Sequence, residues 1–326
     1  MRNGSAGAAD LIVDVTGYTL ATPGGAGGAA WAWVWGYYGQ LGNGDTADSA
    51  LPVAVAGPNT VTAIAGGALN GYALRSDGIV WAWGYGASGE LGNGGTTDSA
   101  VPVQVSGLGN ITAIAGGNVN GYALRGDGTV WAWGVGRDGE LGNGGTTDSP
   151  VPVQVSGLTH ITAIAGNARS GYALSRDGTM WAWGLGDLGQ LGNGSTTNSP
   201  VPVQVSGLTH ITAMAGNAGS GYALRSDGTV WAWGAGYYGQ LGNGGNTDSA
   251  VPVRVSGPSD ITAIAAGSAT AYALRADGTA LAWGLSDYGQ LGNGGTTNSA
   301  TPVQISGLVN ISAIACRHNT GYAIIH

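Results

Sequence analysis

Two glutamates occupy equivalent positions fifty residues apart, and they are the first residues in this chain whose type and spacing suggest chemistry. Two carboxyl groups at a defined separation can hydrolyse a glycosidic bond. Glu90 and Glu140 stand at a repeated position that is glutamine in four other copies, namely Gln40, Gln190, Gln240 and Gln290. We interpret the two glutamates as a tolerated exchange of glutamine for glutamate on a turn.

Histidines and loop carboxylates are the next candidates, as metal ligands. His160 and His210 lie one period apart, at a position that other copies fill with Asn110, Asp260 and Asn310. This pattern predicts turn residues. His318 lies near the single cysteine, Cys316, but no further zinc ligand is close in sequence.

One acidic or amide residue recurs in each loop that begins with Asn-Gly. These residues are Asp48, Asp98, Asp148, Asn198, Asp248 and Asn298. Calcium requires six or more oxygens, so one such residue per loop favours a side-chain cap on a turn. No phosphate-binding loop and no nucleophile with its base is present. The sequence therefore predicts neither an active site nor a cofactor.

Variable side chains on a constant frame are the third candidate class, and they suggest binding. One variable loop follows the tryptophans and contains Trp35, Tyr37, Tyr38, Tyr85, Arg137, Asp138, Asp187, Tyr237, Tyr238, Asp287 and Tyr288. The other precedes a Gly-Tyr-Ala-Leu segment and contains Asn70, Asn120, Arg169, Arg317 and His318. Tyrosine, tryptophan and arginine often anchor interfaces. We expect these loops to contact a partner, with neutral drift in exposed loops as the alternative.

The elements that carry these loops repeat every fifty residues. Trp83, Trp133, Trp183, Trp233 and Trp283 mark five close copies, and Trp33 marks a looser one. In one copy the expected strands are 111–115, 121–125, 129–134 and a short strand ending at 152–155. Asp127-Gly128 favours a type I′ hairpin turn. The two tryptophans of the third strand share one face and predict the main packing between neighbouring sheets.

Four short antiparallel strands per copy are typical of a β-propeller blade. The first strand is rich in alanine and glycine, which suits the crowded axis, and fifty residues are too many for one coil of a β-helix. The chain enters at a third strand and leaves after a second strand. We therefore predict an all-β propeller of six four-stranded blades, closed by pairing of residues 31–55 with residues 311–324.

Several of these segments together resemble the RCC1 (regulator of chromosome condensation) repeat. They are Ala113-Ile114-Ala115-Gly116, Tyr122-Ala123-Leu124, Asp127-Gly128, Trp133-Gly134 and Gly139-Glu140-Leu141-Gly142-Asn143-Gly144. The resemblance covers residues 31–326 and implies a propeller with a protein-binding face. Such propellers usually have seven blades, and they commonly carry a histidine where this chain has Asn70, Asn120, Ser170, Ser220, Thr270 and Thr320.

The resemblance also bears on activity. The founding member of the family promotes guanine-nucleotide exchange on a small GTPase through a projecting wedge, and the constant spacing of this chain leaves no insertion for one. A relative of the same broad fold, a bacterial inhibitor of β-lactamase, binds through the same kind of loops.

Composition narrows the classes of partner. The 326 residues include 65 glycines, no phenylalanine, ten arginines and lysines against 18 aspartates and glutamates, and a net charge of -8. All ten basic residues are arginine. This balance argues against nucleic-acid binding, and no apolar run is long enough for a membrane span. The absence of lysine and phenylalanine suggests a GC-rich bacterial genome.

Residues 1–28 stand outside the repeat, and residues 29–326 form the expected propeller domain. The first segment ends in a linker rich in glycine and alanine, and it has no compact apolar core that would indicate a signal peptide. Its stretch NGSAGAADLIVDVTGYT resembles the last strand of a β-domain found in exported actinobacterial proteins, which would make this chain part of a longer secreted protein. A strand that leans on the propeller is the alternative.

These observations favour a non-enzymatic scaffold that binds another protein through its variable loops. A carbohydrate-binding propeller is the first alternative, because exposed aromatic rings beside amides and carboxylates suit sugars. Guanine-nucleotide exchange is the second.

Overall fold

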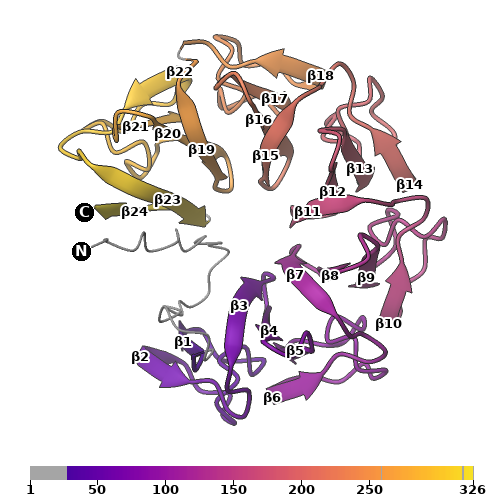
Figure 1. Ribbon diagram of the computed structural model, residues 1–326. Coiled ribbons are helices and arrows are strands. Elements are labelled where there is room, and N and C mark those ends of the chain that lie inside the picture. Colours follow the sequence, from indigo (N-terminus) through magenta and orange to yellow (C-terminus); the bar gives the residue numbers. More distant parts are fainter. Residues whose placement is uncertain (1–27, 258, 318, 326) are drawn as a thin grey trace, which may run out of the picture.

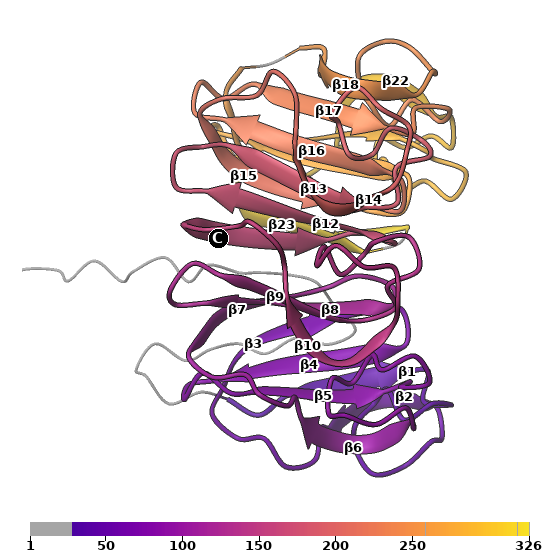
Figure 2. The ribbon, with the colours of Figure 1, turned by 90° about the vertical axis from the view of Figure 1, so that its right-hand side faces the viewer.

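The chain forms a ring of small antiparallel sheets around a central axis (Figure 1). The computed structural model describes residues 28–257, 259–317 and 319–325. All regular elements within these ranges are strands. Figure 2, a side view, shows the strands running from one face of the flat ring towards the other. The predicted all-β propeller architecture is therefore confirmed.

Five complete blades each consist of four consecutive strands, ordered from the axis to the rim. They are β3 (Val61–Gly66), β4 (Asn70–Arg75), β5 (Val80–Gly84) and β6 (Ser99–Gln104); β7 (Ile111–Gly116), β8 (Asn120–Arg125), β9 (Val130–Gly134) and β10 (Ser149–Gln154); β11 (Ile161–Gly166), β12 (Ser170–Ser175), β13 (Met180–Gly184) and β14 (Ser199–Gln204); β15 (Ile211–Gly216), β16 (Ser220–Arg225), β17 (Val230–Gly234) and β18 (Ser249–Arg254); and β19 (Ile261–Ala266), β20 (Thr270–Arg275), β21 (Ala280–Gly284) and β22 (Ser299–Gln304). Two half-blades complete the set: β1 (Trp31–Val34) with β2 (Ser49–Ala54), and β23 (Ile311–Arg317) with β24 (Thr320–Ile325).

The innermost strands are rich in small residues because their backbones nearly touch around the axis. A Cβ atom added at Gly116 would lie 2.3 Å from the carbonyl oxygen of Gly66, and one added at Gly166 would lie 2.6 Å from that of Gly116. Neighbouring blades therefore cannot approach this closely with larger residues at these positions. The predicted innermost position of the first strand of each copy is confirmed.

The hairpin between the second and third strands is not the predicted type I′ turn. That turn needs positive φ at both central residues, whereas here only Gly128 has one, at 82°. The Gly128 N–H donates to the Arg125 carbonyl, and the Arg125 N–H donates to the Thr129 carbonyl, both at 2.9 Å. The geometry is a three-residue loop with a glycine bulge, and the Asp127 carboxylate stabilises it by accepting from the Thr129 N–H.

Tryptophans join each blade to the one before it, as predicted. Trp133 of β9 is 1% exposed, and its Nε1–H donates to the Glu90 carbonyl of the preceding blade at 2.9 Å. Its indole also packs edge-to-face on Tyr72, with ring centroids 5.7 Å apart. The same Trp-to-carbonyl bond recurs from Trp83, Trp183, Trp233 and Trp283.

The two half-blades do not share a sheet in this structure. β1 pairs only with β2, and β24 pairs only with β23, among the described residues. In Figure 1 the described strands of the two half-blades lie apart, and we call the place between them the seam. The chain thus supplies strands for six blades, but among the described residues the predicted pairing across the seam is absent.

Candidate functional site

The two variable loops predicted from the sequence lie on one face of the ring. Within a blade, the loop between the first and second strands meets the loop that follows the third strand. The Val135 N–H, for example, donates to the Val119 carbonyl at 3.1 Å, and the Asn120 side-chain amide donates to the Val135 carbonyl. These bonds fasten the two variable loops of each blade into one surface, which we call the loop face.

Residues that recur in every copy hold the loop that follows the third strand in shape. The Asp148 carboxylate accepts from the Gly136 N–H at 3.0 Å, and equivalent residues do so in the other copies. Gly134 begins the loop with φ of 99°, a conformation that side chains other than glycine rarely adopt. The predicted cap role of the recurrent Asp and Asn residues is confirmed.

Aromatic side chains gather on the loops of the half-blade β1–β2, the first complete blade and the last two complete blades. We call them the aromatic arc, which comprises Trp35, Tyr37, Tyr38, Tyr85, Tyr237, Tyr238 and Tyr288. Tyr288 is 80% exposed, Tyr37 67% and Tyr237 55%. Tyr38 contacts the rings of Trp35, Tyr37 and Tyr85 edge-to-face, and Tyr237 contacts Tyr238 with centroids 4.6 Å apart. The arc presents rigid apolar rings to solvent.

Charged side chains occupy the loop face between the two ends of the arc and pair with one another. Arg169 bonds the Asp138 carboxylate, and its Nε–H donates to Glu140 Oε1 at 3.3 Å. Arg137 bonds Asp148 at 3.0 Å. We call these five residues the ion cluster. The Asn198 amide donates to Asp138 at 2.9 Å, which gives Asp138 a second contact with the blade that carries Arg169.

Glu90 and Glu140 are buried beneath the loop face and hold its loops. The Ser88 N–H donates to Glu90 at 2.8 Å, and the Asp138 N–H donates to Glu140 at 2.7 Å. The glutamines at the same position accept the equivalent loop N–H bond, as Gln40 does from Tyr38. The interpretation of a tolerated exchange is therefore confirmed.

The two glutamates differ in what surrounds their charge. Burial raises the pKa of Glu90 above its ordinary value; loop N–H groups oppose the shift, and the nearby carboxylates of Asp148 and Asp98 add to it. Burial likewise raises the pKa of Glu140; loop N–H groups oppose the shift, the Asp138 carboxylate adds to it, and the Arg169 guanidinium opposes it. Both glutamates thus lie near other carboxylates, and Glu140 in addition has the Arg169 guanidinium in direct contact.

Some predicted contact residues have a structural role instead. Asn70 and Asn120 are buried, 2% and 0% exposed, and their amides bond the loop that follows the third strand. The expectation that they contact a partner is wrong for this reason. Asp187 and Asp287 are exposed on the loop face as predicted. Arg317 ends β23, and His318 lies outside the described residues.

The histidines predicted as turn residues are confirmed in that role. His160 and His210 have φ of 57° and 58°, close to Asn110 and Asn310 at 57° and 56°. Each histidine Nδ1 lies 3.1 Å from the hydroxyl of the preceding threonine. Among the described residues no cluster of three or more potential metal ligands is present.

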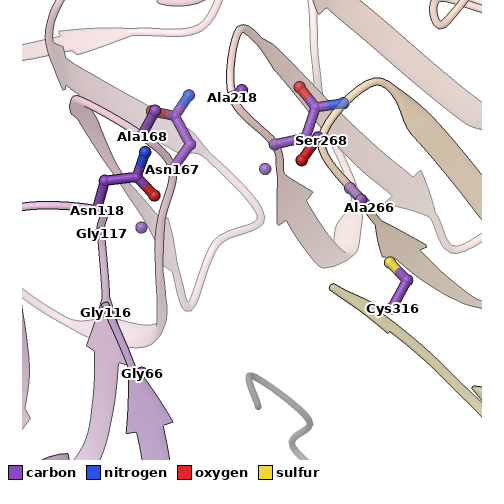
Figure 3. Close-up of a pocket in the computed structure, with 14 residues that line it drawn as sticks. Gly66, Gly116, Gly117, Asn118, Asn167, Ala168, Ala218, Ala266, Ser268 and Cys316 are labelled. Carbon is purple, nitrogen blue, oxygen red and sulfur yellow. The ribbon is translucent and has the colours of Figure 1, made fainter. Parts of the chain in front are cut away.

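The mouth of the central channel opens at the loops between the first and second strands (Figure 3). Its cavity of about 120 Å³ is lined by backbone, small residues and the amides of Asn118, Asn167 and Asn217. The Asn167 amide is engaged within its own loop, where its oxygen accepts from the Ser170 N–H at 2.8 Å. The lining also includes Cys316, the single cysteine of the chain, which Figure 3 labels.

Within the described residues, no helix is long and apolar enough to cross a membrane.

The comparisons with known proteins agree with this architecture. A family model described as RCC1-like domain matches residues 25–323. The chain belongs to the RCC1-like domain family. The resemblance drawn from the repeat motifs is therefore confirmed. Among curated protein sequences, none matches this chain significantly.

Three solved structures show the same RCC1-like fold. Yeast RCC1 (Prp20), in a crystal structure bound to Kap60, is 22% identical, with 91% of this chain and 76% of that chain covered and a TM-score of 0.81. Prp20p from Saccharomyces cerevisiae, in a structure reported with its binding to Gsp1p and histones, is 22% identical over 90% and 77%, with a TM-score of 0.78. Human WBSCR16 is 23% identical over 89% and 79%, with a TM-score of 0.79.

The sequence reasoning missed the partnership between Arg169 and the buried Glu140. The two residues are 29 positions apart, and they come together because neighbouring blades place their loops side by side. Both depart from the repeat, Glu140 from glutamine and Arg169 from the residues at its position in other copies. Two such departures of opposite charge in consecutive copies are the signal that predicts the pair.

Proposed function

We propose that this RCC1-like propeller binds a protein partner through the aromatic arc on its loop face. The observation that carries the proposal is the exposure of Tyr288, Tyr37 and Tyr237, which are 80%, 67% and 55% exposed on loops fastened by hydrogen bonds. Exposed aromatic rings that lie next to one another are typical of interaction sites, because they supply apolar contact area at a small cost in entropy.

The frame beneath the arc supports the proposal. The N–H groups of Tyr38, Tyr238 and Tyr288 each donate to the glutamine two residues later at 2.7–2.8 Å. Because these bonds already order the loop backbone, little conformational entropy is lost when a partner binds, and more of the contact energy appears as affinity. Yeast Prp20, which contains this fold, was crystallised bound to Kap60, so protein binding has a precedent in that protein.

The proposal is tested by site-directed crosslinking and by substitution. A photo-reactive phenylalanine at Tyr237 should capture a partner from a lysate, and the same probe at Val201, which is 41% exposed on β14 at the rim, should not. Replacing Tyr37, Tyr38, Tyr237 and Tyr238 by alanine should lower the affinity for the purified partner by two orders of magnitude or more. Equal affinity of this variant and wild type would contradict the proposal.

No specific observation favours the carbohydrate-binding or the nucleotide-exchange alternative. Each alternative has its own assay. A carbohydrate-binding propeller should give a reproducible signal on a glycan array, and an exchange factor should accelerate nucleotide release from a GTPase. The protein-binding proposal depends on the aromatic arc.

A further inference from the structure

One of the five complete blades lacks an arginine that the other four have. In those four the second strand ends in Arg75, Arg125, Arg225 and Arg275. In the blade of β11–β14 this position is Ser175, and an arginine stands one residue later, as Arg176. The backbone is the same, because the Arg176 N–H donates to the His160 carbonyl at 3.0 Å, as the Ser226 N–H donates to the His210 carbonyl at 2.9 Å. The difference therefore concerns the side chains alone.

In the blade of β7–β10 the arginine lies over the first tryptophan of the third strand. The guanidinium carbon of Arg125 is 4.9 Å from the centroid of the Trp131 ring. A cation in this place is attracted by the negative face of the indole. The Arg125 Nε–H also donates to the Gly109 carbonyl at 3.3 Å, in the loop before the first strand. Arg125 thus combines a ring contact with a hydrogen bond to a carbonyl.

In the three other blades the arginine pairs with the aspartate of the hairpin. Each guanidinium lies 2.9–3.5 Å from the Oδ2 atom of the aspartate two residues later, in the pairs Arg75–Asp77, Arg225–Asp227 and Arg275–Asp277. A ring face, a carbonyl and a carboxylate are therefore the groups that the repeat places around a guanidinium.

The same three groups stand in the blade of β11–β14, around an open cavity. Trp181, Thr159 and Asp177 occupy the repeated positions of the ring, the carbonyl and the carboxylate, and all three line a cavity of about 440 Å³. We call it the Trp181 cavity. Ser175 lines it too and accepts from the Trp181 Nε1–H at 3.2 Å. The serine satisfies the edge of the indole, but its side chain is too short to reach where a guanidinium would lie.

Asp177 lacks the cation that its equivalents have. In three of those, hydrogen bonds from the hairpin threonine lower the pKa of the aspartate, and the arginine two residues earlier lowers it further; they are Asp127, Asp227 and Asp277. Hydrogen bonds from Thr179 also lower the pKa of Asp177, but the further contribution comes from His160. Arg176 is exposed and forms no ion pair with any residue that the structure describes. The Asp177 carboxylate is therefore charged and accessible to a cation from outside the blade.

We propose that the Trp181 cavity binds a guanidinium group carried by a ligand, either an arginine side chain of a partner protein or a small guanidinium compound. The guanidinium lies over the Trp181 ring, where Arg125 lies over Trp131 in the preceding blade. Its N–H groups donate to Asp177 Oδ2 and to the Thr159 carbonyl. An ammonium group fits less well, because it has no planar face for the ring and no fixed fork of donors.

The Trp181 cavity lies on the face of the ring opposite to the loop face. β12 begins at Ser170, beside the loop that carries Arg169, and ends at Ser175 in the cavity. An extended strand of this length spans about 17 Å. The inference therefore does not rest on the aromatic arc, and the variant with four arc tyrosines replaced by alanine should bind a guanidinium ligand as wild type does.

Binding to the full chain is measured by calorimetry and by the NMR signals of the indole N–H groups. The probes are the peptides acetyl-Gly-Arg-Gly-amide and acetyl-Gly-Lys-Gly-amide, together with agmatine, a small guanidinium compound. The arginine peptide should bind one to one and shift the signal of Trp181, which is assigned by its loss in Trp181→Leu. The lysine peptide should bind about tenfold more weakly.

The same titrations distinguish the two sources of the guanidinium. Tighter binding of the peptide supports an arginine side chain of a partner protein, and tighter binding of agmatine supports a small compound. If neither the arginine peptide nor agmatine binds, or if the lysine peptide binds as tightly as the arginine peptide, the proposal is wrong.

The repeats supply variants that should keep the fold. Ser175→Arg combined with Arg176→Ser gives this copy the sequence Leu-Arg-Ser-Asp-Gly, which occurs at 74–78 and 224–228. The new arginine should fill the Trp181 cavity from within and abolish binding of the peptide and of agmatine. Trp181→Leu copies the residue of the last complete blade, Leu281, and should weaken binding about tenfold by removing the ring.

Arg176→Ala tests the cation that lines the cavity. This variant should bind at least as tightly as wild type, because a like charge is removed. Binding that appears only in Arg176→Ala would show that Arg176 itself occupies the cavity and would overturn the proposal. Undiminished binding by the variant with Ser175→Arg and Arg176→Ser would overturn it as well.

Discussion

The aromatic arc and the ion cluster lie on the same face of the same repeat frame, yet they satisfy their side chains in opposite ways. In the cluster, Arg169 forms ion pairs with Asp138 and with the buried Glu140 of the neighbouring blade. In the arc, Tyr237 and Tyr288 direct their rings to solvent. A charged residue must give up its internal ion pair before it can contact a partner, whereas an exposed rigid ring is ready to make contact. Residues that vary between repeats therefore do one of two things: they pair with each other within the molecule, or they are exposed for contact with a partner.

Single substitutions across the loop face should show the largest contrast. Tyr237→Ala or Tyr288→Ala should weaken binding of a purified partner by about 10- to 100-fold, the range of an interface anchor. Asp187→Ala, in the loop between the two regions, should change it by less than threefold. Titration of each variant by surface plasmon resonance measures the contrast. Losses spread evenly over all three positions would remove the distinction between the arc and the rest of the loop face.

Removing the Arg169 side chain should lower the stability of the fold instead of weakening partner binding. Arg169→Ala leaves Glu140 buried without its ion-pair partner, and a fully buried pair would lose about 3–5 kcal/mol. Because the Arg169 side chain is 43% exposed, we expect a smaller loss of about 1–2 kcal/mol in the free energy of unfolding.

Denaturant unfolding measures this loss, and Glu140→Gln is the matched second change. In the Glu140→Gln background, Arg169→Ala should cost much less, because glutamine carries no charge and already stands at this position in four copies. An undiminished cost in that background would show that Arg169 acts through Asp138 alone.

The pH dependence of stability should differ between the two buried glutamates. A carboxyl whose pKa is higher in the folded state stabilises the fold below its ordinary pKa of 4.5, and this contribution is lost as the pH rises through the raised value. Glu90→Gln should therefore gain stability relative to wild type as the pH rises from 4 to 8. Glu140→Gln should gain less, because the Arg169 guanidinium contacts the Glu140 carboxylate and opposes the raised pKa. Thermal unfolding across this pH range checks the order, and a pH-independent difference for Glu90→Gln would contradict it.

The exposed pair of the cluster should contribute least. Arg137 is 68% exposed in its side chain where it bonds Asp148, and a pair this accessible to solvent contributes little to stability. Arg137→Ala should lower the midpoint of denaturant unfolding by less than Arg169→Ala does at low salt, and by still less at high salt. A loss as large as that of Arg169→Ala would place Arg137 in the buried part of the cluster.

Much of the frame could be predicted from the sequence because it depends on short-range patterns. Alternation in 129–134 predicts a strand with both tryptophans on one face, and the structure places Trp133 in the interface between blades. The hairpin type was missed because Asp-Gly is compatible with two turn geometries, and the extra residue of the bulge is decided by the pairing of the flanking strands. Asn70 and Asn120 were wrongly expected to contact a partner. Their position next to a loop can be read from the sequence, but their burial depends on the neighbouring loop that covers them.

The sequence by itself determined the repeat, the four strands of each copy, the tryptophan contacts between blades and the membership of an all-β propeller class. These follow from residue type and spacing within one fifty-residue period. Only the tertiary structure decided which variable side chains pair with each other and whether the two half-blades share a sheet. Both outcomes depend on contacts between blades, such as the contact of Arg169 with Glu140, and no pattern within one repeat encodes such contacts.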